Sequence, residues 1–112
     1  KLAEKIMRRV VNVSDEPVSI DFIVDSVCEH MNMTPADING KSRRRETVKA
    51  RQIVMYLAHK LTNLPASRIG RLIGGRDHST VIHSFRKVEE QILEDKDLAD
   101  LIALIDNSLR SR

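Results

Sequence analysis

Hydrophobic residues recur every three or four positions in several separate blocks of this chain, which is the spacing of amphipathic α-helices. The clearest block is the aliphatic stripe from Ile20 to Met31, and Ser19 stands before it as a candidate N-cap. The same spacing predicts further helices over about Leu2–Asn12, Thr47–Thr62, Ala66–Ile73 and His78–Glu94, and a last one that begins after Asp95 or Asp97. No segment alternates like a β-strand, so the sequence predicts an all-α helical bundle.

Start and stop signals separate these helices from one another. Pro17 disfavours helix in the residues before it, which marks 13–18 as a linker. Thr34 followed by Pro35 is a helix start, because threonine caps free N–H groups and proline suits the first turn. That helix is predicted to be short, because Asn39-Gly40 ends it. The residues that follow, 41–46, are predicted to form a basic loop.

The most specific local signal lies in the turn before the helix predicted over 78–94. Gly74 and Gly75 permit a tight reversal with positive φ out of the preceding helix. Asp77 is placed to cap the next helix by accepting from the backbone N–H of Ser79 or Thr80. Two helices joined by a glycine-bearing turn form a helix-turn-helix unit. The second helix has a short polar front, which suits the major groove of DNA.

Charge is distributed unevenly along the 112 residues, although the formal net charge is only +3. From Val10 to Gly40 there are six acidic residues and no Lys or Arg, whereas 41–87 holds twelve Lys or Arg and two acids. The sign reverses again over 88–106, with seven acids against one lysine. A single charge run usually marks a solvated face, but this basic block coincides with the helix-turn-helix unit. That coincidence indicates a nucleic-acid surface in the middle third of the chain.

Other classes of function find little support in the sequence. Cys28 is the single cysteine, which excludes an internal disulfide, and its place on an apolar helix face predicts burial. No apolar run is long enough to span a bilayer and no signal peptide is present, so we expect a soluble cytoplasmic protein. Asp77, His78 and Ser79 are consecutive, so their side chains point about 100° apart on a helix and cannot form a catalytic relay. His78 and His83 are poorly spaced to share a metal ion. We expect neither catalysis nor a metal site.

The run Gly-Gly-Arg-Asp-His-Ser-Thr-Val from Gly74 to Val81 closely resembles the signature of the DnaA family of bacterial chromosomal replication initiators, in their C-terminal DNA-binding domain (domain IV). The resemblance extends from about Val18 to the C-terminus and includes the basic loop, Ala50-Arg51-Gln52, Leu61-Thr62-Asn63 and Ile69-Gly70. It implies a Trp-repressor-like helix-turn-helix domain over residues 18–112. Residues 1–17 resemble the helix and linker that connect this domain to an upstream ATPase module. The sequence contains no glycine-rich phosphate loop, so we expect ATP to bind only in that module and no cofactor in this chain.

The resemblance also implies how the domain binds double-stranded DNA. In the family, the helix after the signature enters the major groove of the DnaA box, an asymmetric origin site similar to TTATCCACA. By position, the base contacts in this groove are Asp77, His78 and Ser79. Arg43 of the basic loop enters the adjacent minor groove, whose negative potential attracts a guanidinium. Contacts to the DNA backbone, or support for the contacting residues, are implied for Lys41, Arg44, Arg45, Lys49, Arg51, Gln52, Arg76, Thr80, His83 and Lys87.

Three positions depart from the family pattern. His59 stands where many members have a lysine, and a neutral imidazole weakens any phosphate contact from that site. The chain has Leu64-Pro65-Ala66-Ser67 where relatives often place Leu-Pro two residues later, which puts their thymine-methyl contacts in doubt here. Ser84 replaces a common alanine.

Alternatives remain for how the DNA-binding surface is used. A helix-turn-helix transcription regulator at promoters would need the same groove-facing chemistry. A module that binds acidic protein partners would bind DNA without regard to sequence. The acidic C-terminal helix packs in the core or against a second copy. Because no dimerisation segment is evident, we expect one monomer per box.

Overall fold

A computed structural model describes residues 19–110, which form helices joined by short connections. In chain order these are α2 (Ile20–Met31), α3 (Pro35–Asn39), α4 (Arg45–Leu61), α5 (Ala66–Leu72), α6 (His78–Glu94) and α7 (Lys96–Arg110). No β-strand occurs within 19–110, which confirms the all-α prediction. None of these helices is both long and apolar enough to cross a membrane. The helix predicted over Leu2–Asn12 and its linker lie outside the described residues.

Helices α2, α3, α6 and α7 begin at capping side chains, which accept hydrogen bonds from N–H groups that the first turn leaves unbonded. The Ser19 hydroxyl accepts a hydrogen bond from the backbone N–H of Phe22 at 3.2 Å. Thr34 and Asp37 form a reciprocal capping box, in which each side chain accepts from the other's backbone nitrogen at 3.3 and 3.1 Å. Of the two candidate caps for α7, Asp95 is the one observed: its carboxylate accepts from the backbone N–H of Leu98 at 3.1 Å.

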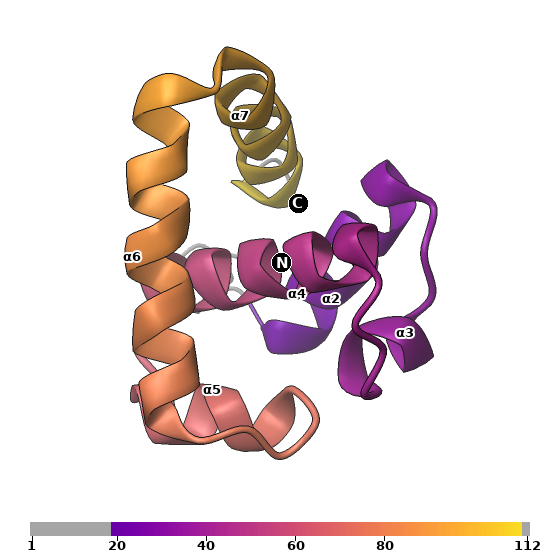
Figure 1. The fold of residues 1–112 in the computed structure, drawn as a ribbon, viewed down its shortest axis with the longest axis vertical. Coiled ribbons are helices and arrows are strands. Elements are labelled where there is room, and N and C mark those ends of the chain that lie inside the picture. The colour runs from indigo at the N-terminus through magenta and orange to yellow at the C-terminus, as the bar shows by residue number, and fades with distance from the viewer. Residues whose placement is uncertain (1–18, 111–112) are drawn as a thin grey trace, which may run out of the picture.

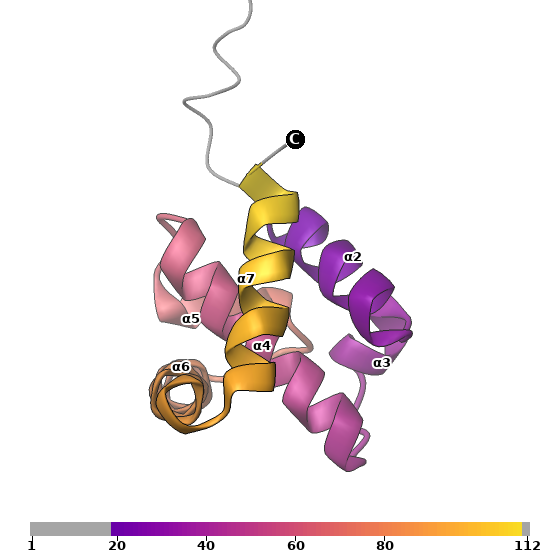
Figure 2. The same ribbon diagram turned by 90° about the horizontal axis from the view of Figure 1, so that it is seen from above.

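Helix α4 is the centre of the bundle. Every residue from Ile53 to Ala58 is buried, so α4 is enclosed on all sides, as expected for a helix surrounded by others. It packs against α2, α3, α5 and α6, while α7 packs against α2 and α6. Figure 2 shows α7 lying across the bundle between those two helices. Helix α6 runs along one side, which places its first turn beside α5, at the end far from α7 (Figure 1).

Some details differ from the sequence prediction. Helix α4 begins at Arg45 rather than Thr47, so part of the predicted basic loop is helical. Its N-cap residue, Arg44, makes no capping bond from its side chain, which explains why the sequence carries no start signal there. The apolar spacing of the helix predicted over Ala66–Ile73 places Leu72 beside the inward-facing Ile69 and Ile73, but Leu72 is 46% exposed at the end of α5. Cys28 is buried as predicted, and burial raises the pKa of its thiol.

The turn between α5 and α6 depends on glycine. Gly74 and Gly75 have φ of +75° and +71°, the left-handed values that the sequence predicted there. Gly70 matters for another reason, because a Cβ at that position would collide with the backbone carbonyl of Arg76. The Arg76 N–H donates to the Gly70 carbonyl at 2.7 Å. The backbone of the turn therefore lies directly against α5, and the start of α6 is fixed relative to it.

Candidate nucleic-acid interface

The first turn of α6 presents small polar side chains to solvent. The Asp77 carboxylate caps the helix, accepting from the backbone N–H of Thr80 at 3.1 Å and from its hydroxyl at 3.0 Å. Of the two predicted capping partners, Thr80 is the one observed. These bonds, the backbone one first, hold the pKa of Asp77 below its ordinary value. His78 and Ser79 are both exposed beside it, so the turn is anchored while its outer face remains accessible.

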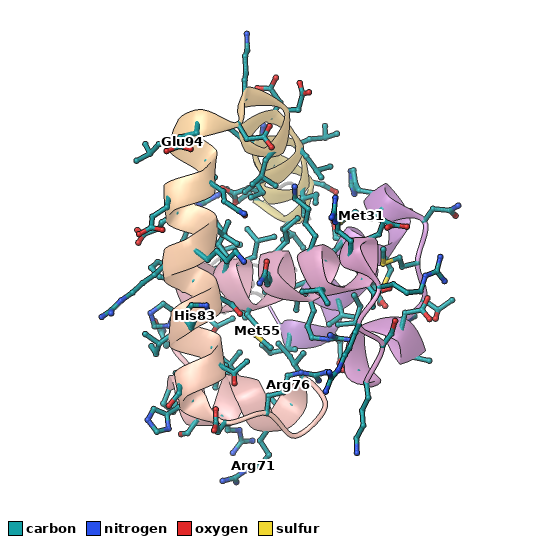
Figure 3. All side chains as sticks on the ribbon, in the orientation of Figure 1. Met31, Met55, Arg71, Arg76, His83 and Glu94 are labelled. Atoms are coloured by element: carbon teal, nitrogen blue, oxygen red, sulfur yellow. The ribbon has the colours of Figure 1, made fainter. Side chains whose placement is uncertain are left out.

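Two arginines connect the segment around Gly40 to α4 and to the turn before α6. Arg51 is buried, and its Nε donates to the Ile38 carbonyl at 2.8 Å. Its terminal nitrogens donate to the carbonyls of Asp37, Gly40 and Ser42 at 3.1, 3.1 and 3.2 Å. Arg76, labelled in Figure 3, donates to the Gly40 carbonyl at 2.6 Å and to the Ile73 carbonyl at 2.8 Å. These guanidinium groups therefore join the segment after α3 to α4 and to the turn before α6.

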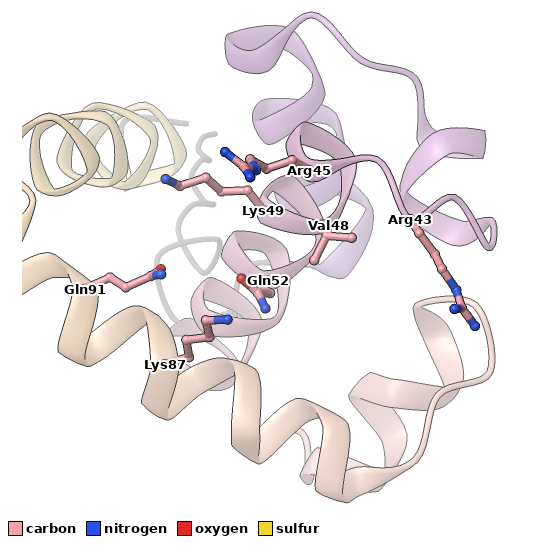
Figure 4. Close-up of a pocket in the computed structure, with 7 residues that line it drawn as sticks. All are labelled: Arg43, Arg45, Val48, Lys49, Gln52, Lys87 and Gln91. Carbon is pink, nitrogen blue, oxygen red and sulfur yellow. The ribbon is translucent and has the colours of Figure 1, made fainter.

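A basic groove of about 450 Å³ lies between the first half of α4 and the second half of α6. It is lined by Arg43, Arg45, Val48, Lys49, Gln52, Lys87 and Gln91, with no acidic side chain among them. Figure 4 shows Arg45, Lys49 and Gln52 facing it from α4, opposite Lys87 and Gln91 on α6. Arg43 extends from the preceding loop in a different direction, away from Arg45 and Lys49. The structure thus brings together four of the basic residues predicted to contact DNA, namely Arg43, Arg45, Lys49 and Lys87.

Two shallower hollows adjoin the first turn of α6. One, of about 330 Å³, is lined by Ser67, Arg71, Gly75, Arg76, Asp77 and His78. The other, of about 340 Å³, is lined by His78, Ser79, Ile82, His83 and Arg86. His78 borders both, so the polar turn lies at the junction of the two. Arg71 and Arg86 were not among the predicted contacts, although both fall within the basic block of the sequence.

The remaining predicted residues are more dispersed. Lys41 and Arg44 are exposed on the loop before α4 and do not line the basic groove. Arg44 lies 4.0 Å from the carboxylate of Glu46, and both side chains are well exposed. His83 is exposed one turn beyond the start of α6, as Figure 3 shows. These residues flank the interface rather than form its centre.

Two of the positions that depart from the family pattern, His59 and Ser84, are accommodated by packing. His59 is half-buried, and its ring meets the Phe85 ring edge-on with centroids 4.6 Å apart. The Phe85 ring in turn stacks on Tyr56, with centroids 5.2 Å apart. Ser84 is buried on the inner side of α6, whereas Ser67 is exposed and lines the hollow beside the turn. His59 therefore faces the α4–α6 contact instead of extending into solvent.

Within residues 19–110, no group of three or more His, Cys, Asp or Glu side chains is placed to hold a metal ion. The carboxylate of Asp77 is bonded to Thr80, so it does not orient His78 as a catalytic relay requires. The exposed chemistry of this face consists of positive charge and hydrogen-bonding groups, which suits binding.

Comparisons with known proteins agree with this geometry. A family model described as the bacterial dnaA protein helix-turn-helix matches residues 20–88. The chain is 40% identical over 111 residues to the chromosomal replication initiator protein DnaA of Bacteroides fragilis, covering 99% of this chain and 23% of that protein. It is 39% identical over 110 residues to the protein of the same name from Cereibacter sphaeroides, covering 98% of this chain and 24% of the relative. The chain thus spans about a quarter of the length of these relatives.

Proposed function

The chain belongs to the bacterial DnaA helix-turn-helix family, and from this premise we propose that it binds DnaA-box sites in double-stranded DNA at a replication origin. Membership in the family makes it a DNA-binding domain of replication initiation. The matched family model is a helix-turn-helix, which is a binding module and not a catalytic one. Helices α5 and α6 form this unit, and α6 is the recognition helix.

One observation carries the proposal: the exposed polar turn of α6 is bordered by positively charged hollows. Asp77, His78 and Ser79 stand at a helix end, where side chains reach base edges in the major groove. Their hydrogen-bonding groups differ in kind, since a carboxylate accepts from an amino group whereas a hydroxyl both donates and accepts. The surrounding Lys and Arg side chains neutralise phosphates on either side. In this assignment the polar turn contacts the bases, and the neighbouring Lys and Arg side chains contact the DNA backbone.

The loop before α4 supplies a second contact. Arg43 is exposed and extends away from Arg45 and Lys49, so it can reach a neighbouring minor groove while those two residues meet phosphates. Arg51 and Arg76 are assigned a supporting role, because their guanidinium groups donate to carbonyls of the fold. In this assignment the contacting residues are those with free, exposed ends.

Selection of bound sequences from a random duplex pool tests the function. Recovery of an asymmetric TTATCCACA-like site is the expected result. A palindromic site would favour the helix-turn-helix regulator, and the absence of any enriched sequence would contradict base readout altogether. The relatives are bacterial replication initiators, so we place this activity in the bacterial cytoplasm and ATP binding in a separate module of the whole protein.

Stoichiometry is tested on a duplex with a single box. The unit has one recognition helix, and the asymmetric site offers one half-site, so we propose one monomer per box. Sedimentation of the complex is expected to give one protein per duplex. Two proteins on a single box would contradict the monomer proposal.

A further inference from the structure

Arg71 is an exposed guanidinium beside the polar turn that has no assigned role. It lies in the last turn of α5, the first helix of the helix-turn-helix unit. It lines the hollow of about 330 Å³ that Asp77 and His78 border from the other side. Figure 3 shows its side chain extending outward at the end of the molecule where α5 and the turn meet. Arg71 is therefore next to the residues proposed to read bases.

The backbone at Arg71 is fixed relative to the recognition helix. Its carbonyl accepts from the N–H of Gly75 at 3.3 Å, within the turn that leads into α6. One residue before Arg71, the Gly70 carbonyl accepts from Arg76 at 2.7 Å. The backbone of Arg71 therefore keeps a fixed position relative to a DNA duplex bound against α6. Only the Arg71 side chain needs to adjust to contact the duplex.

No acidic side chain in residues 19–110 forms an ion pair with Arg71 within 4.0 Å. Asp77, the nearest acid across the hollow, directs one carboxylate oxygen to both donors of Thr80. Between Thr47 and Val88, Asp77 is also the only acidic residue in the sequence. The hollow thus holds two guanidinium groups, Arg71 and Arg76, against the single carboxylate of Asp77, and this excess of positive charge at an accessible surface favours a phosphate.

We propose that Arg71 binds a backbone phosphate of the DNA, which extends the protein–DNA contact from α6 and the basic loop onto α5. The proposal rests on the proposed function for its orientation of the duplex. In helix-turn-helix proteins the second helix occupies the major groove while the first crosses the backbone, so the end of α5 lies over a phosphate. A guanidinium there makes bidentate, charge-assisted bonds to phosphate oxygens and carries no sequence preference of its own.

The salt dependence of binding tests this contact. Each phosphate neutralised adds about 0.9 to the slope of log K against log salt, so Arg71→Ala is expected to reduce the slope by about one. Between 50 and 200 mM salt, the loss of affinity is then about 3- to 4-fold smaller for the variant than for the parent. The reduction is expected on box and scrambled duplexes alike. Arg71→Lys retains the charge and is expected to retain the slope.

Arg110→Ala is the matched control, because it removes the same charge from the far end of α7, where Arg110 pairs with Asp106. An unchanged slope for Arg71→Ala, or a loss of affinity confined to the box, overturns the phosphate contact. Equal slope changes in Arg71→Ala and Arg110→Ala overturn it too, because net charge alone then explains them. If the parent binds box and scrambled duplex equally well, the proposed function is contradicted. The effect of Arg71→Ala on the salt slope with scrambled duplex still tests the phosphate contact.

Discussion

Arg51 and Arg76 donate to the same acceptor, the backbone carbonyl of Gly40, at 3.1 and 2.6 Å. The two arginines are 25 residues apart and come from different elements, α4 and the turn before α6. Burial lowers the pKa of both guanidinium groups, and their mutual repulsion adds to this for Arg51. Since like charges repel, several carbonyl acceptors are needed to hold them together. Gly40 thus links the position of the basic loop to that of α6.

Arg51→Ala is predicted to destabilise the domain by about 2–3 kcal/mol, because it leaves the buried Ile38 carbonyl and the part-buried Asp37 and Ser42 carbonyls without this donor. Arg51→Lys is expected to recover only part of this, since an ammonium cannot reproduce a planar fork. Urea unfolding measures both. Arg45→Ala, which removes an exposed arginine of the same helix, is the control and should unfold like the parent. A parent-like Arg51→Ala would contradict the supporting role.

Gly70→Ala is predicted to be strongly destabilising, although alanine normally favours a helix. The added methyl would collide with the Arg76 carbonyl, so the turn must move away from α5 or the bond at 2.7 Å must break. Because this movement displaces α6, loss of DNA affinity should accompany the lower melting temperature. Ser67→Ala, an exposed change in the same helix, is the control for folding. Normal melting and binding by Gly70→Ala would disprove the close approach.

The helices were predictable from the sequence because their signals are local. A cap, a proline and the spacing of apolar residues lie within one or two turns of each other, as at Ser19 and at Thr34–Asp37. The start of α4 was misplaced by two residues because Arg44 provides no capping bond. The features of the candidate interface that the structure confirms are also local: the positive φ of the glycine turn and the cap at Asp77.

The roles of single basic residues were not predictable in the same way. Arg51 and Arg45 belong to the same charge block, yet one is buried among carbonyls 9 to 14 residues distant and the other is exposed. Only the fold separates them, because the partners of Arg51 are backbone atoms brought near by α3. Arg71 depends on the fold in the same way, since the hollow that it shares with His78 forms only when the turn brings α5 and α6 together.

The cap at Asp77 predicts a dependence of stability on pH. The bonds from Thr80 lower the pKa of the folded carboxyl below 3.8, so the ionised side chain stabilises the folded state. This stabilisation is fully present above about pH 4 and is lost as the pH falls through the lowered pKa. Thermal unfolding of the parent and of Asp77→Asn at pH 7 and pH 3 should show the advantage of the parent shrinking in acid. An advantage independent of pH would contradict this linkage.

Arg43→Ala is predicted to weaken binding mainly to boxes with an A/T-rich flank, because it removes a minor-groove contact. Arg45→Ala and Lys49→Ala serve as comparisons, since these residues line the basic groove and are expected to weaken binding to all duplexes similarly. Titration of boxes with A/T-rich and G/C-rich flanks measures the difference. If Arg43→Ala bound both as well as the parent does, the assignment of this loop would be wrong.

Within the first turn of α6, we predict that some side chains affect only DNA sequence recognition, whereas Asp77 also affects the stability of the fold. His78→Ala and Ser79→Ala should melt like the parent, because both side chains are exposed and the cap comes from Asp77. Each should reduce discrimination between box and scrambled duplex by about 1–3 kcal/mol, the usual effect of losing a good base contact. Asp77→Ala should differ by also lowering the melting temperature by roughly 5 °C, the order expected from a lost N-cap in a small domain. The measurements are titrations of each variant with box and scrambled duplex, together with its thermal unfolding. Equal losses on the two duplexes for His78→Ala and Ser79→Ala would mean that this turn positions α6 without reading the sequence.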